Sequence, residues 1–179
     1  MPDMPPAGRC VTLHTMKPFF VSCVLAAMAW GASAQTLWRD APMLASPADI
    51  RALMPQARET TPAQRAVDPS ALLEIPATPI AGETFSATYH FESERLQRIH
   101  LRAQPATRER TQALLKTLQA SLRASYGLPV SAASRPVPAL GTVDLLWAFR
   151  RMTVQLLMVD GKTVELIYSA NIPSQKLGL

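Results

Sequence analysis

The chain has 179 residues, with 18 Lys and Arg against 13 Asp and Glu, so its formal net charge is +5. A hydrophobic fraction of 48% and a charged fraction of 17% exclude both an acidic disordered chain and a polybasic tail. The two cysteines are too few for a disulfide-rich scaffold or a cysteine-based zinc site.

Residues 1–34 have the pattern of a secretory signal peptide. Lys17 precedes an apolar run over 19–30, and Ala32-Ser33-Ala34 is a sequence of the kind that signal peptidase cleaves. The apolar run is shorter than the ~20 residues that a membrane-spanning helix needs. We therefore expect cleavage after Ala34, a periplasmic or secreted protein, and no transmembrane span in the mature chain. Residues 1–15 either extend the positive start of this leader or precede the true start at Met16.

Cleavage would remove both cysteines, Cys10 and Cys23. A lipid anchor on Cys23 is the rival interpretation, but the apolar stretch before it is short and no Leu-Ala-Gly motif precedes it. The mature chain would have 145 residues, with 16 basic and 12 acidic side chains and a net charge of +4. A chain of that length can bury one hydrophobic core, which would have to stabilise it without disulfides.

The segment 35–80 is predicted to hold a short helix and a proline-rich linker. Ser46 can cap a helix that begins at Pro47, and Pro55 would end it after about two turns. The polar, proline-containing stretch 55–70 predicts an extended surface linker. The residues that follow, 71–75, predict a short edge strand that Pro76 and Pro79 would stop.

The segment 81–172 is predicted to form an α+β domain, and 173–179 a tail. Its first two strands cover 83–91 and 95–103, in which apolar and polar residues alternate. Pairing Tyr89 with Ile99 and Ala87 with Leu101 brings both apolar sets onto one face, so we expect that register.

The longest predicted helix covers 107–126. Thr107 can cap it, and leucines and a tyrosine recur at steps of three and four to form one apolar stripe: Leu114, Leu115, Leu118, Leu122 and Tyr126. Gly127 suits a left-handed position after the helix, and Pro129 prevents its continuation. Residues 130–141 are predicted to be a loop.

Three further strands are predicted over 143–149, 152–158 and 163–169, with Trp147 in the core. A two-residue turn at Asp160-Gly161 would mix polar and apolar residues on both faces of the last hairpin. We therefore expect a three-residue loop, Val159-Asp160-Gly161, which pairs Met158 with Lys162. This loop keeps the apolar set on one face: Met152, Val154, Leu156, Val164, Leu166 and Tyr168.

The predicted fold is therefore α+β, an antiparallel sheet of about five strands in the order strand–strand–helix–strand–strand–strand. The long helix should cover the apolar face of the sheet, and a short helix should precede it. The opposite face should meet water.

Two histidines of the mature chain, His90 and His100, are predicted to lie diagonally on that water-facing side. No acidic third ligand is expected between them on that face, and Arg98 and Arg102 would repel a cation, so we expect no metal site and no cofactor. Arg95 joins Arg98, His100 and Arg102 in a basic strip. The strip could bind a phosphate-bearing or carboxylate-bearing partner, or simply be a solvated face with charges that protect the sheet.

No motif for catalysis is present. The mature chain has no cysteine, no G-x-S-x-G nucleophile, no glycine-rich phosphate loop and no pair of carboxylates on one predicted wall. Nucleic acid is not expected as a partner, because the net charge is small and the leader directs the protein away from it.

Several features have the order found in small uncharacterised exported proteins of proteobacteria. They are Phe91, Leu96, Ile99-His100-Leu101, a helix ending Ser125-Tyr126-Gly127-Leu128-Pro129, then Trp147, Val154/Leu156 and Leu166/Tyr168. Over roughly 46–170 the chain thus resembles the domain shared by the SmpA/OmlA outer-membrane assembly lipoproteins and the β-lactamase-inhibitor proteins. It departs from them in lacking a lipobox cysteine, and from the assembly lipoproteins in its helix order. The resemblance implies a role in protein–protein contacts and transfers no site residue.

Two hypotheses follow. The first is an exported, non-catalytic binding or accessory protein that contacts another envelope protein or an anionic surface. The second is a small-ligand carrier or a hydrolytic enzyme with a pocket between the helix and the sheet, with Tyr89 or Tyr168 in its lining.

Overall fold

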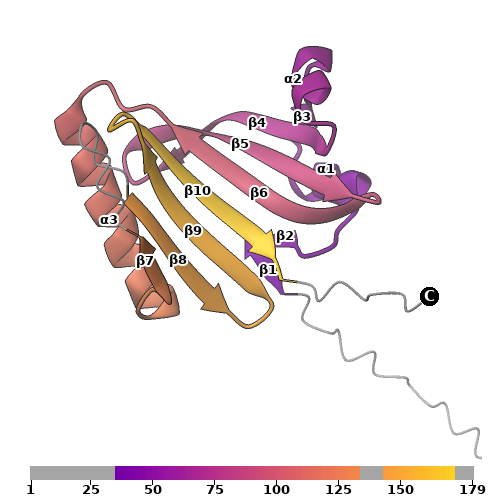
Figure 1. The fold of residues 1–179 in the computed structure, drawn as a ribbon. Helices are drawn as coiled ribbons and strands as arrows, with labels where there is room; N and C mark the ends of the chain where they lie inside the picture. Colours follow the sequence, from indigo (N-terminus) through magenta and orange to yellow (C-terminus); the bar gives the residue numbers. More distant parts are fainter. Residues whose placement is uncertain (1–34, 134–142, 172–179) are drawn as a thin grey trace, which may run out of the picture. The chain divides into compact units, whose positions relative to one another are not determined.

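The computed structural model describes residues 35–133 and 143–171. The predicted leader, most of the predicted loop and the tail lie outside these ranges. The described residues form an α+β fold built on an antiparallel sheet of eight strands (Figure 1). In spatial order the strands are β3 (Arg58–Glu59), β4 (Ala71–Ile80), β5 (Glu83–Glu92), β6 (Arg95–Ala103), β10 (Thr163–Ala170), β9 (Met152–Val159), β8 (Val143–Phe149) and β7 (Ser131–Ala133). The fold class is confirmed, and the expectation of about five strands is wrong.

The strand β4 is the largest departure from the predicted sheet. It runs for ten residues past Pro76 and Pro79, which were expected to stop it, and its pairing with β5 shifts register between Ile75 and Thr78. A proline lacks only the N–H group, and β4 is paired on its outer side to β3 at Leu73 and Glu74 alone. The prolines therefore lie along an edge where no neighbour needs their N–H groups. They also block that edge against pairing with another chain.

The stretch 55–70 is folded locally rather than extended. It contains β3 and a second helix, α2 (Pro62–Val67), so the linker prediction is wrong. Thr61 and Gln64 form a reciprocal capping box, and Pro62 occupies the first helical position. These local signals specify the helix start even though no apolar stripe marks the helix.

The core face of the sheet is covered by two groups of elements. The long helix α3 (Arg108–Tyr126) packs on it through the predicted leucine stripe, next to β8 and β10. The short helix α1 (Pro47–Leu53), with the predicted Ser46 cap, and the small hairpin of β1 (Thr36–Trp38) and β2 (Ala41–Pro42) cover the other end (Figure 1). Trp147 is fully buried, as predicted. No helix within the described ranges has the length and apolar character to cross a membrane.

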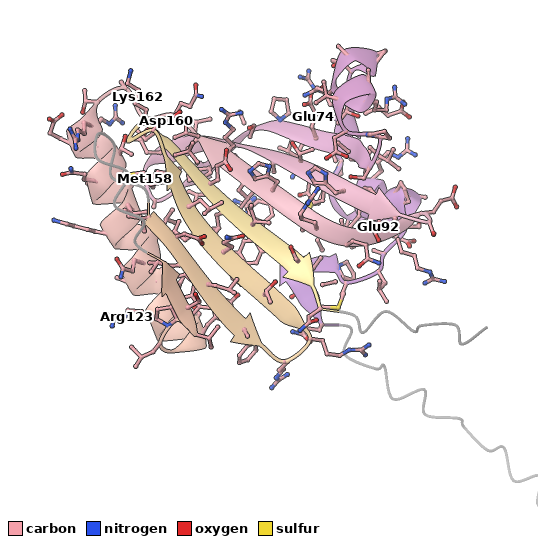
Figure 2. The ribbon with its side chains drawn as sticks, in the orientation of Figure 1. Glu74, Glu92, Arg123, Met158, Asp160 and Lys162 are labelled. Atoms are coloured by element: carbon pink, nitrogen blue, oxygen red, sulfur yellow. The ribbon has the colours of Figure 1, made fainter. Side chains whose placement is uncertain are left out.

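The strand registers fix which side chains share a face. Tyr89 pairs with Ile99 and Ala87 with Leu101, as predicted. In the last hairpin Val164 pairs with Met158, two residues away from the predicted partner Lys162. The loop is Asp160-Gly161-Lys162 (Figure 2), with positive φ at Asp160 and Gly161. A register shift of two residues leaves every side chain on the same face of the sheet. The pattern of buried and exposed residues alone therefore could not distinguish the two registers.

Candidate functional site: the open face of the sheet

The face of the sheet opposite the core carries the charged and polar side chains of β5, β6 and β10. We call this side the open face. Its central residues are Thr88, His90, Arg98, His100, Arg102 and Glu165. The strand order brings β10 next to β6, so Glu165 lies directly across from Arg102. Two of the predicted strip residues, His100 and Arg102, therefore meet a carboxylate from the last strand.

Asp68, at the C-cap of α2, contacts three polar side chains of the open face and its edge. Its Oδ1 accepts hydrogen bonds from the Ser70 backbone N–H at 2.9 Å and the Ser70 hydroxyl at 2.6 Å. Its Oδ2 lies 3.1 Å from Nδ1 of His90 and 3.5 Å from a guanidinium nitrogen of Arg98. The hydrogen bond from the Ser70 side chain is the main reason that the pKa of Asp68 is lowered. The carboxylate therefore links α2 to two strands of the sheet.

His90 is buried, which corrects the prediction that both histidines are exposed. Its exposed fraction is 7%, because the Asp68–Ala71 segment folds over it: Ala71 pairs with His90, and the Ser70 carbonyl accepts the Phe91 N–H. Burial and the neighbouring Arg98 lower the pKa of His90 to about 4, against the opposing effect of Asp68. The imidazole is therefore neutral at pH 7.

Three side chains contact one nitrogen of His90. Asp68 Oδ2 and Ser70 Oγ both lie 3.1 Å from Nδ1, and a guanidinium nitrogen of Arg98 lies 3.2 Å from it. The carboxylate can only accept a proton from Nδ1 and the guanidinium can only donate one to it, so these two contacts call for opposite tautomers. Nε2 is buried and has no hydrogen-bond partner. Ser70, His90 and Asp68 thus do not form a charge relay, which needs the serine and the carboxylate on opposite nitrogens.

His100 lies half-buried beside His90, with ring centroids 6.4 Å apart at an angle of 35°. Its Nε2 is 3.2 Å from Oε2 of Glu165, an ion-pair distance, although the direction does not make a hydrogen bond. Oε1 of the same carboxylate lies 3.7 Å from Nε of Arg102. The predicted basic strip is therefore a mixed row in which Asp68 and Glu165 balance Arg98 and Arg102.

Arg95 is not part of this row. It lies at the turn between β5 and β6, where it lines a separate hollow of about 260 Å³ with Ser46 and Asp49 at the start of α1. The structure therefore brings together three of the four predicted strip residues and leaves the fourth apart.

The helix α2 forms one wall of a groove over the open face. The groove has a volume of about 410 Å³, with His90, His100 and Thr88 on its floor and apolar side chains on its wall: Ala63, Val67 and Ala71. A second hollow of about 270 Å³ opens on the other side of His90, lined by Ser70, Arg98, Gln97, Glu92 and Ser169. His90 thus contributes to both hollows.

A second set of polar contacts, made by the Glu74 carboxylate, holds α2 in place, and we call it the Glu74 clamp. The Gln64 side chain donates to Oε2 of Glu74 at 2.7 Å, while Arg58 donates to Oε1 at 3.0 Å. Glu74 is only 8% exposed and projects from β4 close to α2 (Figure 2). With Asp68 fixing its end, α2 is anchored at two points. The wall of the groove is therefore a built feature of the fold.

Among the described residues, no set of three or more His, Cys, Asp or Glu side chains is arranged to hold a metal ion. Carboxylates do lie beside both histidines, which the sequence did not indicate.

No protein-family model matches the chain, and no curated protein matches it. Among solved structures it is similar to a DUF4309 family protein (YjgB) from Bacillus subtilis subsp. subtilis str. 168. The two share 12% identity and a TM-score of 0.41 over 78% of this chain and 83% of that one. A likeness at this level assigns neither a family nor a function. The resemblance to the assembly lipoproteins and the β-lactamase-inhibitor proteins stays a prediction.

Proposed function

We propose that this chain is an exported, non-catalytic binding protein of the cell envelope that contacts its partner through the open face. The observation that carries the proposal is the asymmetry of the sheet in the described ranges. One face is packed under α1, α3 and the β1–β2 hairpin, while the other carries partly exposed arginines beside a walled groove.

The chemistry of the open face favours binding over catalysis. Its serine and carboxylate contact the same nitrogen of His90, so no activated nucleophile arises there. The interface between α3 and the sheet is filled by buried leucines and Trp147, and Tyr89 and Tyr168 are buried in the core. This packing argues against a hydrolase pocket at that interface. The groove beside α2 favours a second candidate, a small-ligand carrier, because its volume suits a small organic molecule.

Site-specific photo-crosslinking in cells tests the proposal. A photoreactive phenylalanine analogue is placed at Thr88 or Thr153 on the open face, and at Gln112 on the exposed side of α3 as the control. We expect one defined crosslinked protein from the open-face positions and none from Gln112. Equal crosslinking from all three positions, or none, would overturn the proposal. A non-covalent small molecule that co-purifies with the chain, seen by native mass spectrometry, would support the carrier instead.

The export step is tested on the same material. Mass spectrometry of the chain recovered from the envelope fraction should give an N-terminus at Gln35, which corresponds to cleavage after Ala34. Recovery of the uncleaved chain from the cytoplasm would contradict the proposed location.

A further inference from the structure

The end of α3 and the turn between β8 and β9 lie at the same side of the molecule (Figure 1). The rings of Tyr126 and Phe149 pack together with centroids 5.4 Å apart, and the Val130 N–H donates to the Leu146 carbonyl of β8 at 2.8 Å. Extending the β7–β8 register by one residue places Val130 opposite Trp147, and therefore on the same face of the sheet as Phe149. These contacts bring the apolar side chains of the two segments onto one surface.

The apolar side chains of this surface are exposed to an unusual extent. Leu128 is 71% exposed, Val130 65% and Phe149 36%. The described residues include six exposed large hydrophobic side chains, so half of them gather here. A single exposed leucine needs no explanation, but a group of neighbouring ones marks an interaction surface. We call Tyr126, Leu128, Val130 and Phe149 the apolar end.

Exposed arginines surround the apolar end. The Arg150 guanidinium lies 5.2 Å from the centre of the Phe149 ring, Arg151 follows it in the turn, and Arg123 lies on the last turn of α3 (Figure 2). The segments 123–131 and 148–151 contain no acidic residue. Among the described residues, no carboxylate lies within ion-pair distance of these three arginines. Unlike the open face, where acids balance the arginines, this surface is positively charged.

The described domain begins and ends at this surface. The side-chain nitrogen of Gln35 lies 3.5 Å from the Phe149 carbonyl oxygen, and the Asn171 N–H donates to the Arg151 carbonyl at 2.7 Å. Gln35 directly follows the predicted leader, whose apolar run over 19–30 is the kind of segment that enters a membrane during export. While that leader is uncut, the covalent link to it lies beside Phe149.

We propose that the apolar end docks on the surface of a bilayer that contains anionic lipids. The apolar side chains enter the boundary between headgroups and acyl chains, while the arginines contact lipid phosphates. Arginine suits this place, because its guanidinium binds phosphate oxygens and its aliphatic stem can lie along apolar surface. The proposal goes beyond the proposed function and needs only its export step, since the partner protein contacts a different surface.

Charge favours a lipid surface over a second copy of this chain as the occupant. Two copies related by a two-fold axis would present the same patch to each other. The arginines that surround both patches would then face one another, and such like-charge contacts are unfavourable. An anionic bilayer accepts the arginines and the apolar side chains together.

Vesicle flotation tests the proposal with the chain that begins at Gln35, which contains every residue of the described core. The vesicles are made of phosphatidylglycerol mixed with phosphatidylcholine, or of phosphatidylcholine alone. We expect the chain to float with the mixed vesicles and far less with the neutral ones. Added salt should weaken the binding, because it screens the exposed arginines from the headgroups.

A double variant tests the contribution of charge. Arg150→Gln/Arg151→Gln should bind the mixed vesicles about 30-fold more weakly, since each arginine near an anionic surface contributes about fivefold. Arg108→Gln/Lys116→Gln removes the same charge from exposed positions of α3 away from its C-terminal end. That control should bind as the wild type, and circular dichroism checks that both variants are folded.

The apolar contribution is tested separately. Leu128→Ser should weaken binding about tenfold, because the leucine side chain no longer enters the bilayer. Val67→Ser is the control, since Val67 is 89% exposed on α2, and it should bind as the wild type. Depth gives a readout that does not depend on affinity. Lipids brominated on their acyl chains should quench the added emission of Val130→Trp and leave that of Val67→Trp unchanged.

Three results would overturn the docking surface: no flotation, equal flotation with neutral and mixed vesicles, or equal losses in the test and control variants. A dimer in sedimentation velocity that Leu128→Ser dissociates would assign the apolar end to a second copy and also overturn the lipid assignment. Crosslinking from Thr88 and Thr153 reports on the open face alone. The failure of this proposal and the failure of the proposed function are therefore distinguishable.

Discussion

Oδ2 of Asp68 lies 3.1 Å from Nδ1 of His90, so a carboxylate at the end of α2 holds a buried imidazole of β5. The pairing does not keep the imidazole charged. Desolvation and the charge of Arg98 lower the pKa of His90 more than the Asp68 carboxylate raises it, so the folded protein keeps the imidazole neutral. This balance makes the stability of the protein sensitive to acid.

The pH dependence follows from the lowered pKa of His90. Its folded value of about 4 is below the ordinary value near 6.5 in the unfolded chain, so the unfolded state takes up the proton first. The free energy of unfolding should therefore be constant with respect to this group above pH 6.5 and fall as the pH drops from 6.5 to 4. We expect a loss on the order of 2 kcal/mol across that window.

Urea unfolding at half-unit steps of pH measures this effect. His90→Gln removes the titrating group, so the difference between wild type and variant isolates it from the carboxylates that titrate nearby. The difference in unfolding free energy should shrink steadily below pH 6.5. A difference that stays constant down to pH 4 would show that His90 does not titrate with a lowered pKa.

The Glu74 clamp should contribute more to the free energy of unfolding than the other ion pairs around α2 do. Glu74→Ala leaves Arg58 and Gln64 without the carboxylate that both contact, and we expect a loss of about 1–3 kcal/mol in urea unfolding. Trypsin should also cut faster after Arg65 in α2. Glu59→Ala is the matched control, because Glu59 is exposed and its ion pairs, with Arg51 and Arg65, lie at the surface. That change should cost less than about 1 kcal/mol. Equal losses of unfolding free energy in Glu74→Ala and Glu59→Ala would mean that the Glu74 contacts stabilise the fold no more than a surface ion pair does.

The parts of the fold that could be predicted are those that a local pattern determines. The alternation of apolar and polar residues predicts the Tyr89–Ile99 register, and the spacing of leucines by three and four residues predicts α3. The α2 helix was missed because it has no buried residue and so no apolar stripe, although Thr61, Pro62 and Gln64 carried its start signal. The length of β4 was missed because the effect of a proline depends on whether a neighbouring strand needs its N–H group, which a single sequence does not show.

The candidate site was predicted in part for a related reason. Face alternation correctly placed Arg98, His100 and Arg102 together. Their acidic partners come from elsewhere: Glu165 reaches them because β10 inserts beside β6, and Asp68 because α2 folds back over β5. Both are long-range relationships. The Asp68-Pro69-Ser70 sequence did contain the signal of a local turn in which the aspartate accepts from the serine two residues on.

The leucine stripe of α3 should provide a large part of the core energy. Leu118 is 5% exposed between the helix and the sheet, so Leu118→Ala leaves a cavity that the helix cannot close fully. We expect the free energy of unfolding to fall by about 2–5 kcal/mol in urea. Lys116→Ala, on the exposed side of the same helix, should change it by less than about 0.5 kcal/mol. A small effect of Leu118→Ala would indicate space at this interface and would favour a pocket there.

The end of α3 depends on a backbone conformation that glycine adopts and other residues avoid. Gly127 has φ of 82° and ψ of −150°, and its carbonyl accepts a hydrogen bond from the Trp147 indole at 3.0 Å. An added Cβ would meet no atom within 4 Å, so any cost of Gly127→Ala comes from backbone strain. We expect that substitution to lower the free energy of unfolding by about 1–3 kcal/mol and to alter the Trp147 fluorescence. Asparagine tolerates the left-handed helical region, but the ψ value lies outside that region, so Gly127→Asn should be destabilised to the same extent. Recovery of wild-type stability in Gly127→Asn would show that the helix ends in the ordinary left-handed conformation instead.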